Sequence, residues 1–106
     1  MTAPRETEIL HAVRAALVAT GRVTIWRCNG GVDVDRGVRY GLGVGAADLI
    51  GLLVPSGRFL GVEIKTPVGR LSMEQKLWGE TVRRGGGVYI VARSAADALE
   101  QLAEVA

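Results

Sequence analysis

The stretch GRFLGVEIKTPVG, residues 57–69, has the composition of a buried β-strand, yet it contains two charged residues. Most of its other residues are of types that sheets favour, namely Phe59, Leu60, Val62 and Ile64. Because strand side chains alternate between the two faces of a sheet, Glu63 and Lys65 point to one face and the aliphatic residues to the other. Gly61 leaves space on the charged face. The pattern therefore indicates a strand that carries a carboxylate and an ammonium group into a sheet.

A second apolar run precedes this strand and predicts a β-hairpin. Residues 47–55, ADLIGLLVP, are typical of a strand, and the dipeptide SG that follows is a short turn. The first strand of such a hairpin begins beside the end of the second, so Asp48 is expected near Glu63 and Lys65. Two carboxylates and a lysine are predicted to converge at one end of the hairpin.

The rest of the chain predicts helices and strands on both sides of this hairpin. The spacing of apolar residues, together with capping residues, predicts helices over residues 6–20, 72–85 and 95–106. Further strands are predicted over residues 23–29 and 87–92. The expected fold is α/β, with the order α-β-β-β-α-β-α.

A glycine-rich segment interrupts this order. Residues 30–46 contain six glycines and mixed charges without hydrophobic periodicity, which predicts a long flexible loop. Loops of this length within compact domains are usually functional. Three arginines in or beside the segment are candidates for contacts with phosphate groups of a polyanionic partner, namely Arg27, Arg36 and Arg39. The alternative is that these arginines belong to an ordinary solvated surface.

Composition limits the chemistry that is available to the chain. Its 106 residues suffice for a single domain, 1–106, and the net charge of +2 permits a polyanionic partner without arguing for one. Cys28 and His11 are the only cysteine and histidine, which argues against a disulfide, a zinc site and a histidine-assisted nucleophile. No signal peptide or membrane-length apolar run is present, so an intracellular location is expected. The chemistry is left to carboxylates, lysine, arginine and a metal that prefers oxygen ligands.

The predicted carboxylate pair suits such a metal. Two ionised carboxylates repel each other, and partial burial increases the repulsion. Mg²⁺ reverses this effect, because it commonly binds one or two protein carboxylates and leaves other positions to water and substrate phosphate. The Lys65 ammonium could orient the attacking water or stabilise developing negative charge. The alternative is a structural ion pair between Glu63 and Lys65.

Polar residues on two helices are expected to face the same region. At about 100° per residue, Glu6 falls on the same helical stripe as Val13 and Leu17, whereas Glu8 falls on the far side. Gln75 borders the apolar stripe of its own helix. The alternatives are a frayed first turn for Glu6 and a capping role alone for Gln75.

In this order, Asp48, the Glu63-Ile64-Lys65 tripeptide and Gln75 resemble the PD-(D/E)XK nuclease pattern, in particular its virus-type replication-repair nuclease (VRR-NUC) branch. The matching runs are GAADLIGLLVPSGRFLGVEIKTPVGRLSMEQ and GGGVYIVARSAADAL. One difference is that Ala47 stands where the family has a proline before the aspartate. That proline shapes the backbone and binds no metal.

The resemblance implies a restriction-endonuclease-like core with a mixed central sheet flanked by helices. It implies that Mg²⁺ or Mn²⁺ is held by Asp48, Glu63, the backbone carbonyl of Ile64 and Glu6. Lys65 would lie beside the attacking water, and Gln75 would support the site. These residues would form the active site of a DNA endonuclease that hydrolyses phosphodiesters and leaves a 5′-phosphate.

Stand-alone members of this branch are often phage-encoded and resemble Holliday-junction resolvases, which implies branched DNA as the substrate and a homodimer as the active form. Two other hypotheses stay open. One is a non-catalytic DNA-binding or assembly protein on the same fold. The other is a small-molecule-binding domain that uses the GLGVGA run, although this run precedes a strand and a dinucleotide fingerprint precedes a helix.

Overall fold

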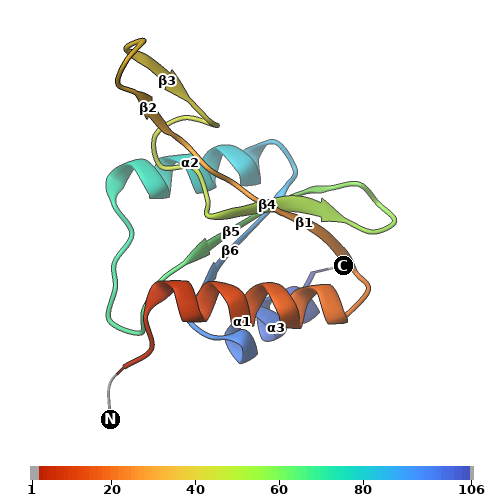
Figure 1. Ribbon diagram of the computed structural model, residues 1–106. Coiled ribbons are helices and arrows are strands. Elements are labelled where there is room, and N and C mark those ends of the chain that lie inside the picture. The colour runs from red at the N-terminus through yellow and green to blue at the C-terminus, as the bar shows by residue number, and fades with distance from the viewer. Residues whose placement is uncertain (1–2, 106) are drawn as a thin grey trace.

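The computed structural model describes residues 3–105 and has the expected α/β architecture (Figure 1). Its elements in chain order are α1 (Glu6–Ala19), β1 (Val23–Arg27), β2 (Gly31–Asp33), β3 (Val38–Tyr40), β4 (Leu49–Leu53), β5 (Phe59–Ile64), α2 (Met73–Arg84), β6 (Val88–Ala92) and α3 (Ala95–Ala103). Apart from the short strands β2 and β3, this is the predicted order α-β-β-β-α-β-α. Within the described residues, no helix is long and apolar enough to cross a membrane.

The four longer strands form one mixed sheet in the order β1-β4-β5-β6. The pairs β1–β4 and β4–β5 are antiparallel, and β5–β6 is parallel. A parallel pair requires a crossover connection, which α2 supplies between β5 and β6. The predicted hairpin is β4–β5, and its register pairs Leu49 with Val62 and Leu52 with Phe59.

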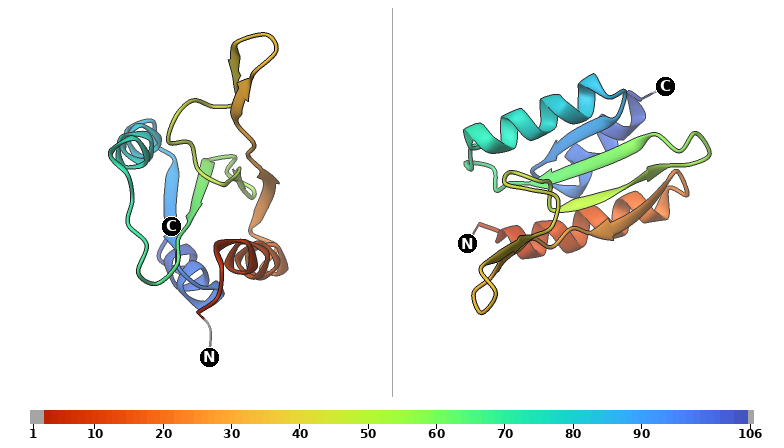
Figure 2. Two further views of the ribbon diagram at one scale, coloured as in Figure 1. Left: turned by 60° about the vertical axis from the view of Figure 1, so that its left-hand side comes forward. Right: turned by 90° about the horizontal axis from the view of Figure 1, so that it is seen from above.

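Helices α1 and α3 cover one face of the sheet, and α2 covers part of the other (Figures 1 and 2). The core lies on the α1–α3 side, where Leu60, Val62 and Ile64 of β5 are almost fully buried. Val13 and Leu17 of α1 pack into the same cluster. The alternation predicted for β5 is therefore confirmed, since its aliphatic residues face this core.

Helix α2 approaches the sheet closely because two glycines stand at the contact. A Cβ atom at Gly61 would lie 2.8 Å from the ring of Trp78, and one at Gly79 would lie 2.5 Å from the ring of Tyr89. Ser72 begins α2 with the expected capping box. These contacts fix the distance between the first turn of α2 and the end of β5.

The prediction of a structureless loop over residues 30–46 is wrong for its first part. Strands β2 and β3 pair in register from Gly31–Tyr40 to Asp33–Val38, and the hairpin projects from the body of the protein (Figures 1 and 2). Oδ1 of Asp33 accepts hydrogen bonds from the backbone N–H groups of Asp35 and Arg36, which closes the turn. Strands of three residues are too short to produce detectable alternation.

Candidate active site

The β4–β5 hairpin brings Asp48 and Glu63 together, within the range of Glu63 to Lys65 that was expected for Asp48. Because Leu49 pairs with Val62, Asp48 stands opposite Glu63 at the next position of the antiparallel ladder. The Asp48 carboxylate is fixed there, since its Oδ2 accepts a 2.8 Å hydrogen bond from the backbone N–H of Ile64. The two carboxyl groups therefore lie on the same face, at the end of β5.

Glu63 is the buried charged residue of the sheet, with 3% of its surface exposed. Its Oε1 accepts a 3.0 Å hydrogen bond from the side-chain amide of Gln75 and lies 4.0 Å from Nζ of Lys65. Its Oε2 is buried and has no hydrogen-bond donor within the described part of the chain. A buried carboxylate oxygen without a donor costs free energy unless a proton or a cation satisfies it.

This environment raises the pKa of Glu63 from 4.5 to about 8. Burial is the largest cause, followed by the charge of the Asp48 carboxylate and its capacity to accept a hydrogen bond from protonated Glu63. Lys65 opposes the shift, and Glu6 adds a smaller repulsion. Without a cation, the site therefore retains a proton at neutral pH.

Gln75 is held at both ends of its side chain. Its Oε1 accepts a 2.8 Å hydrogen bond from the Ser72 backbone N–H, which completes the capping box, while its Nε2 donates to Glu63. Gln75 therefore faces the site, and the alternative of a capping role alone is wrong, because the same amide both caps the helix and donates to Glu63. The start of α2 and the Glu63 carboxylate are coupled through it.

Two supporting residues were not identified from the sequence. Nη1 of Arg93 donates to the backbone carbonyls of Thr66 and Gly69, at 2.6 and 2.7 Å, and so holds the turn that follows Lys65. The hydroxyl of Tyr89 donates to the backbone carbonyl of Gln75 at 3.5 Å. Both contacts join segments far apart in the chain, and the only sequence signal was a basic residue directly before the Ser94 cap.

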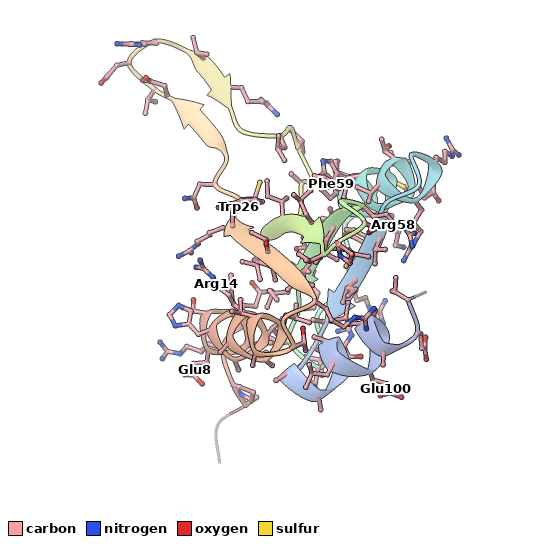
Figure 3. The ribbon with its side chains drawn as sticks, turned by 90° about the vertical axis from the view of Figure 1, so that its right-hand side faces the viewer. Glu8, Arg14, Trp26, Arg58, Phe59 and Glu100 are labelled. Carbon is pink, nitrogen blue, oxygen red and sulfur yellow. The ribbon has the colours of Figure 1, made fainter. Side chains whose placement is uncertain are left out.

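Glu6 lies nearer the carboxylate pair than Glu8, as the helical phase predicts, but the prediction that it faces inward is wrong. Glu6 is exposed and lines a cavity of about 140 Å³ together with Asp48 and Ile64. The buried residues of α1 begin only at Ile9. The helical period predicts the side of the helix on which a residue lies, but it does not predict how deeply each turn is buried. Glu8 points away from the sheet (Figure 3).

The three candidate DNA-binding arginines do not form one cluster. Arg27 lines the cavities on both sides of Asp48. Arg39 lines a separate cavity of about 250 Å³ at the base of the β2–β3 hairpin. Arg36 is exposed at the turn of the hairpin, 3.9 Å from the Asp33 carboxylate. Only Arg27 adjoins the carboxylate pair.

The carboxylate oxygens at the end of β5 are suitable ligands for a hard divalent cation. The unsatisfied Glu63 oxygen and the adjacent Asp48 carboxylate are oxygen ligands of the type that Mg²⁺ prefers. Within residues 3–105, no three His, Cys, Asp or Glu side chains are grouped closely enough to hold a metal by themselves. A cation here would therefore need further oxygens from the backbone, water or substrate, as Mg²⁺ sites commonly do.

Comparison with known proteins gives one family. The sequence model of the VRR-NUC domain family matches residues 2–96 of the chain. No significant match was found among curated proteins or among solved structures.

Proposed function

The chain belongs to the VRR-NUC domain family, which implies a nuclease of the PD-(D/E)XK type, and from this premise we propose a Mg²⁺- or Mn²⁺-dependent DNA endonuclease. The single observation that carries the proposal is the buried Glu63 carboxylate, whose Oε2, beside the Asp48 carboxylate, has no donor among residues 3–105. The 4.0 Å contact with Lys65 involves Oε1, so a structural ion pair does not account for the buried Oε2. The geometry favours a site that is completed by a cation.

Four groups would hold the metal in this proposal, namely the side chains of Asp48, Glu63 and Glu6 and the backbone carbonyl of Ile64. When bound, the metal supplies Lewis-acid activation of water and neutralises negative charge on the phosphate. Glu6 is exposed and does not group closely with Asp48 and Glu63, so it would act at the rim, through a metal-bound water. The Ile64 N–H and Gln75 would hold the Asp48 and Glu63 carboxylates in place.

Lys65 would act on the attacking water and on the phosphate. Its Nζ lies 4.0 Å from Oε1 of Glu63, and 13% of its side-chain surface is exposed, so the ammonium is held near the carboxylates with little contact with water. At this position it would orient the attacking water and stabilise the negative charge that develops on the phosphate. The product would carry a 5′-phosphate.

The proposed substrate is branched DNA, and the proposed active form is a homodimer. A four-way junction offers two symmetry-related phosphodiesters, which a two-fold dimer would cut as a pair.

The second candidate function is a non-catalytic DNA-binding protein. It is favoured only by the elevated pKa of Glu63, since a protonated carboxyl group is a poor metal ligand.

The test is cleavage of linear, flapped and four-way DNAs with Mg²⁺, with Mn²⁺ and with chelator, by the wild type and by Glu63→Gln and Lys65→Ala. We expect metal-dependent cleavage by the wild type and none by either variant, with circular dichroism spectra unchanged. DNA binding without cleavage under every condition would support the non-catalytic alternative. Full activity of a folded Glu63→Gln protein would exclude the mechanism.

A further inference from the structure

A cavity of about 340 Å³ opens beside Asp48, apart from the carboxylate pair itself. It lies where the end of β1, the base of the β2–β3 hairpin and the loop of residues 42–46 meet, with Leu10 of α1 also in its wall. This volume is at the lower end of the range for small-ligand sites, about 300–1,000 Å³. It is large enough for one small ligand and too small for a base pair.

The cavity adjoins the proposed scissile position directly. The backbone N–H of Cys28 donates to the carbonyl oxygen of Asp48 at 2.9 Å, and Asp48 stands opposite Glu63. Cys28, Asp48 and Glu63 therefore form one row across three neighbouring strands. A ligand against Cys28 is one strand away from Asp48 and two from Glu63.

The wall formed by residues 42–46 is anchored to α2. A Cβ atom at Gly45, which has a φ of +86°, would lie 2.4 Å from the Glu74 carbonyl group. The indole N–H of Trp78 donates to the Leu42 carbonyl at 3.4 Å. These contacts tie the wall to the helix whose first turn holds Glu63 through Gln75, so the cavity and the carboxylate share one support.

The groups that line the cavity combine three kinds of contact. Most of the lining surface is polar, with Asn29 and Arg27 among the residues that form it, and Leu10 and Leu42 belong to a smaller apolar part. Arg27 also lines the smaller cavity that contains Glu6, Asp48 and Ile64. A flat ring with several polar edge atoms, joined to a phosphate, matches this set.

We infer that this cavity receives one unpaired nucleotide of the DNA strand, adjacent to the phosphate that is cut. The inference rests on the proposed function and specifies its substrate class. In a continuous duplex the bases are paired and stacked, so a nucleotide enters such a cavity only after costly extrusion. Flaps, junctions and single strands present unpaired nucleotides at lower cost, so the cavity selects them.

The first experiment uses Cys28 as a reporter, because it is the only cysteine of the chain and lines the cavity. The full-length Lys65→Ala protein with Mg²⁺ is alkylated with iodoacetamide in the presence of a 5′-phosphorylated deoxydinucleotide or the same molecule with one abasic position. At saturation, we expect the dinucleotide to slow alkylation at least about tenfold and the abasic compound to have little effect. Equal rates with both compounds, or no protection by either, would overturn the inference.

The second experiment measures cleavage by the wild type of flapped DNAs that carry a normal or an abasic residue beside the cut. Cys28→Met fills the cavity, and Leu99→Met, at a partly exposed position of α3, is the control. We expect the abasic substrate and Cys28→Met each to lower kcat/KM about tenfold, with Leu99→Met near wild type. Equal cleavage of fully paired linear DNA and flapped DNA would contradict the inference.

The two experiments separate this inference from the proposed function. Cleavage of both flapped substrates at one rate, with Cys28 unprotected, leaves the nuclease in place and removes the nucleotide site. Protection of Cys28 without cleavage of any DNA leaves the nucleotide site in place and removes the nuclease. If Cys28→Met does not fold, the alkylation experiment still decides, since it needs no substitution in the cavity.

Discussion

The side-chain amide of Gln75 donates a 3.0 Å hydrogen bond to Oε1 of Glu63, while the amide oxygen accepts from the backbone N–H of Ser72. One side chain therefore caps α2 and orients the buried carboxylate at the same time. The two tasks have different chemical requirements: the cap needs only an acceptor, and Glu63 needs a donor.

Gln75→Glu is predicted to separate these tasks. Glutamate is an accepted residue at this position of a capping box, so the helix should keep its cap, but a carboxylate cannot donate to Glu63 and adds a third negative charge. We expect cleavage to fall at least about a hundredfold, equivalent to about 2.7 kcal/mol, with the helix content unchanged. Kinetics and circular dichroism measure the two effects.

Gln75→Ala is the matched comparison, because it removes both the acceptor that Gln75 adds to the capping box and the donor to Glu63, while the Ser72 hydroxyl still caps the helix. It should lower the melting temperature as well as the activity. If Gln75→Glu cleaves DNA as fast as the wild type, the hydrogen bond to Glu63 has no role in the reaction.

The pKa of Glu63 predicts how the stability of the metal-free protein depends on pH. Folding raises this pKa from 4.5 to about 8, so the folded state binds the proton more tightly than the unfolded state between these values. The contribution of Glu63 is therefore most favourable below pH 4.5 and is lost as the pH rises to about 8. In chelator, we expect the free energy of unfolding of the wild type to fall across this range relative to that of Glu63→Gln.

Thermal and urea unfolding at a series of pH values measure this difference. Metal affinity should rise with pH over the same range, by up to about tenfold per unit, because the metal must displace the proton from Glu63. Parallel pH profiles for the wild type and Glu63→Gln would show that Glu63 does not titrate there.

The carboxylate pair could be predicted from sequence because a short turn sets the register of a hairpin. The predicted turn placed Asp48 near Glu63 to Lys65, and the longer connection of residues 54–57 in the structure sets it opposite Glu63. The hydrogen bond from Gln75 could not be predicted, because it depends on the distance between α2 and the sheet. The contacts of Gly61 with Trp78 and of Gly79 with Tyr89 set this distance. They join segments that meet only in the folded chain.

Other features were missed for different physical reasons. The β2–β3 hairpin has strands of three residues, which carry too little periodicity to be distinguished from a loop. Arg93 forms hydrogen bonds with carbonyls 24 and 27 residues earlier in the chain, and backbone acceptors leave no trace in a sequence pattern. The cavity beside Asp48 is lined by residues from α1, from the end of β1 and from the loop of residues 42–46, and this meeting of separate segments leaves no local signature in the sequence.

Arg93→Met is predicted to destabilise the protein and to impair the site through the turn after Lys65. It removes the side-chain donor from the carbonyls of Thr66 and Gly69, of which Thr66 keeps the backbone N–H of Gly69, and the loss costs about 1–3 kcal/mol of stability. Arg84→Met is the control, since Arg84 is exposed and pairs only with Glu80 on the surface of α2. Urea denaturation should distinguish the variants, and equal stabilities would show that the turn needs no clamp.

The positions of the arginines predict different effects on DNA binding. Arg27→Ala should weaken binding and reduce the salt dependence by about one unit of slope, because Arg27 adjoins Asp48. The double variant Arg36→Ala with Arg39→Ala reports whether the projecting hairpin also contacts phosphates, for which we expect about one unit per contact. Binding to flapped DNA is measured over a range of salt concentrations, with Arg84→Ala as the control. An unchanged slope in the double variant would mean that the hairpin has another role.

The final prediction distinguishes the two acidic residues in the first turn of α1. Both are exposed and both benefit from the helix dipole, so neither needs a catalytic role to explain its presence. Glu6 nevertheless lines the cavity that contains Asp48 and Ile64 and contributes to the raised pKa of Glu63, whereas Glu8 lies beside Arg93 and Ser94. We expect Glu6→Gln to lower kcat/KM at least about tenfold, equivalent to about 1.4 kcal/mol, and Glu8→Gln to stay near wild type. Paired assays at saturating Mg²⁺ decide between them: loss of activity in Glu8→Gln alone would place the helix carboxylate on the wrong side of α1 for this site.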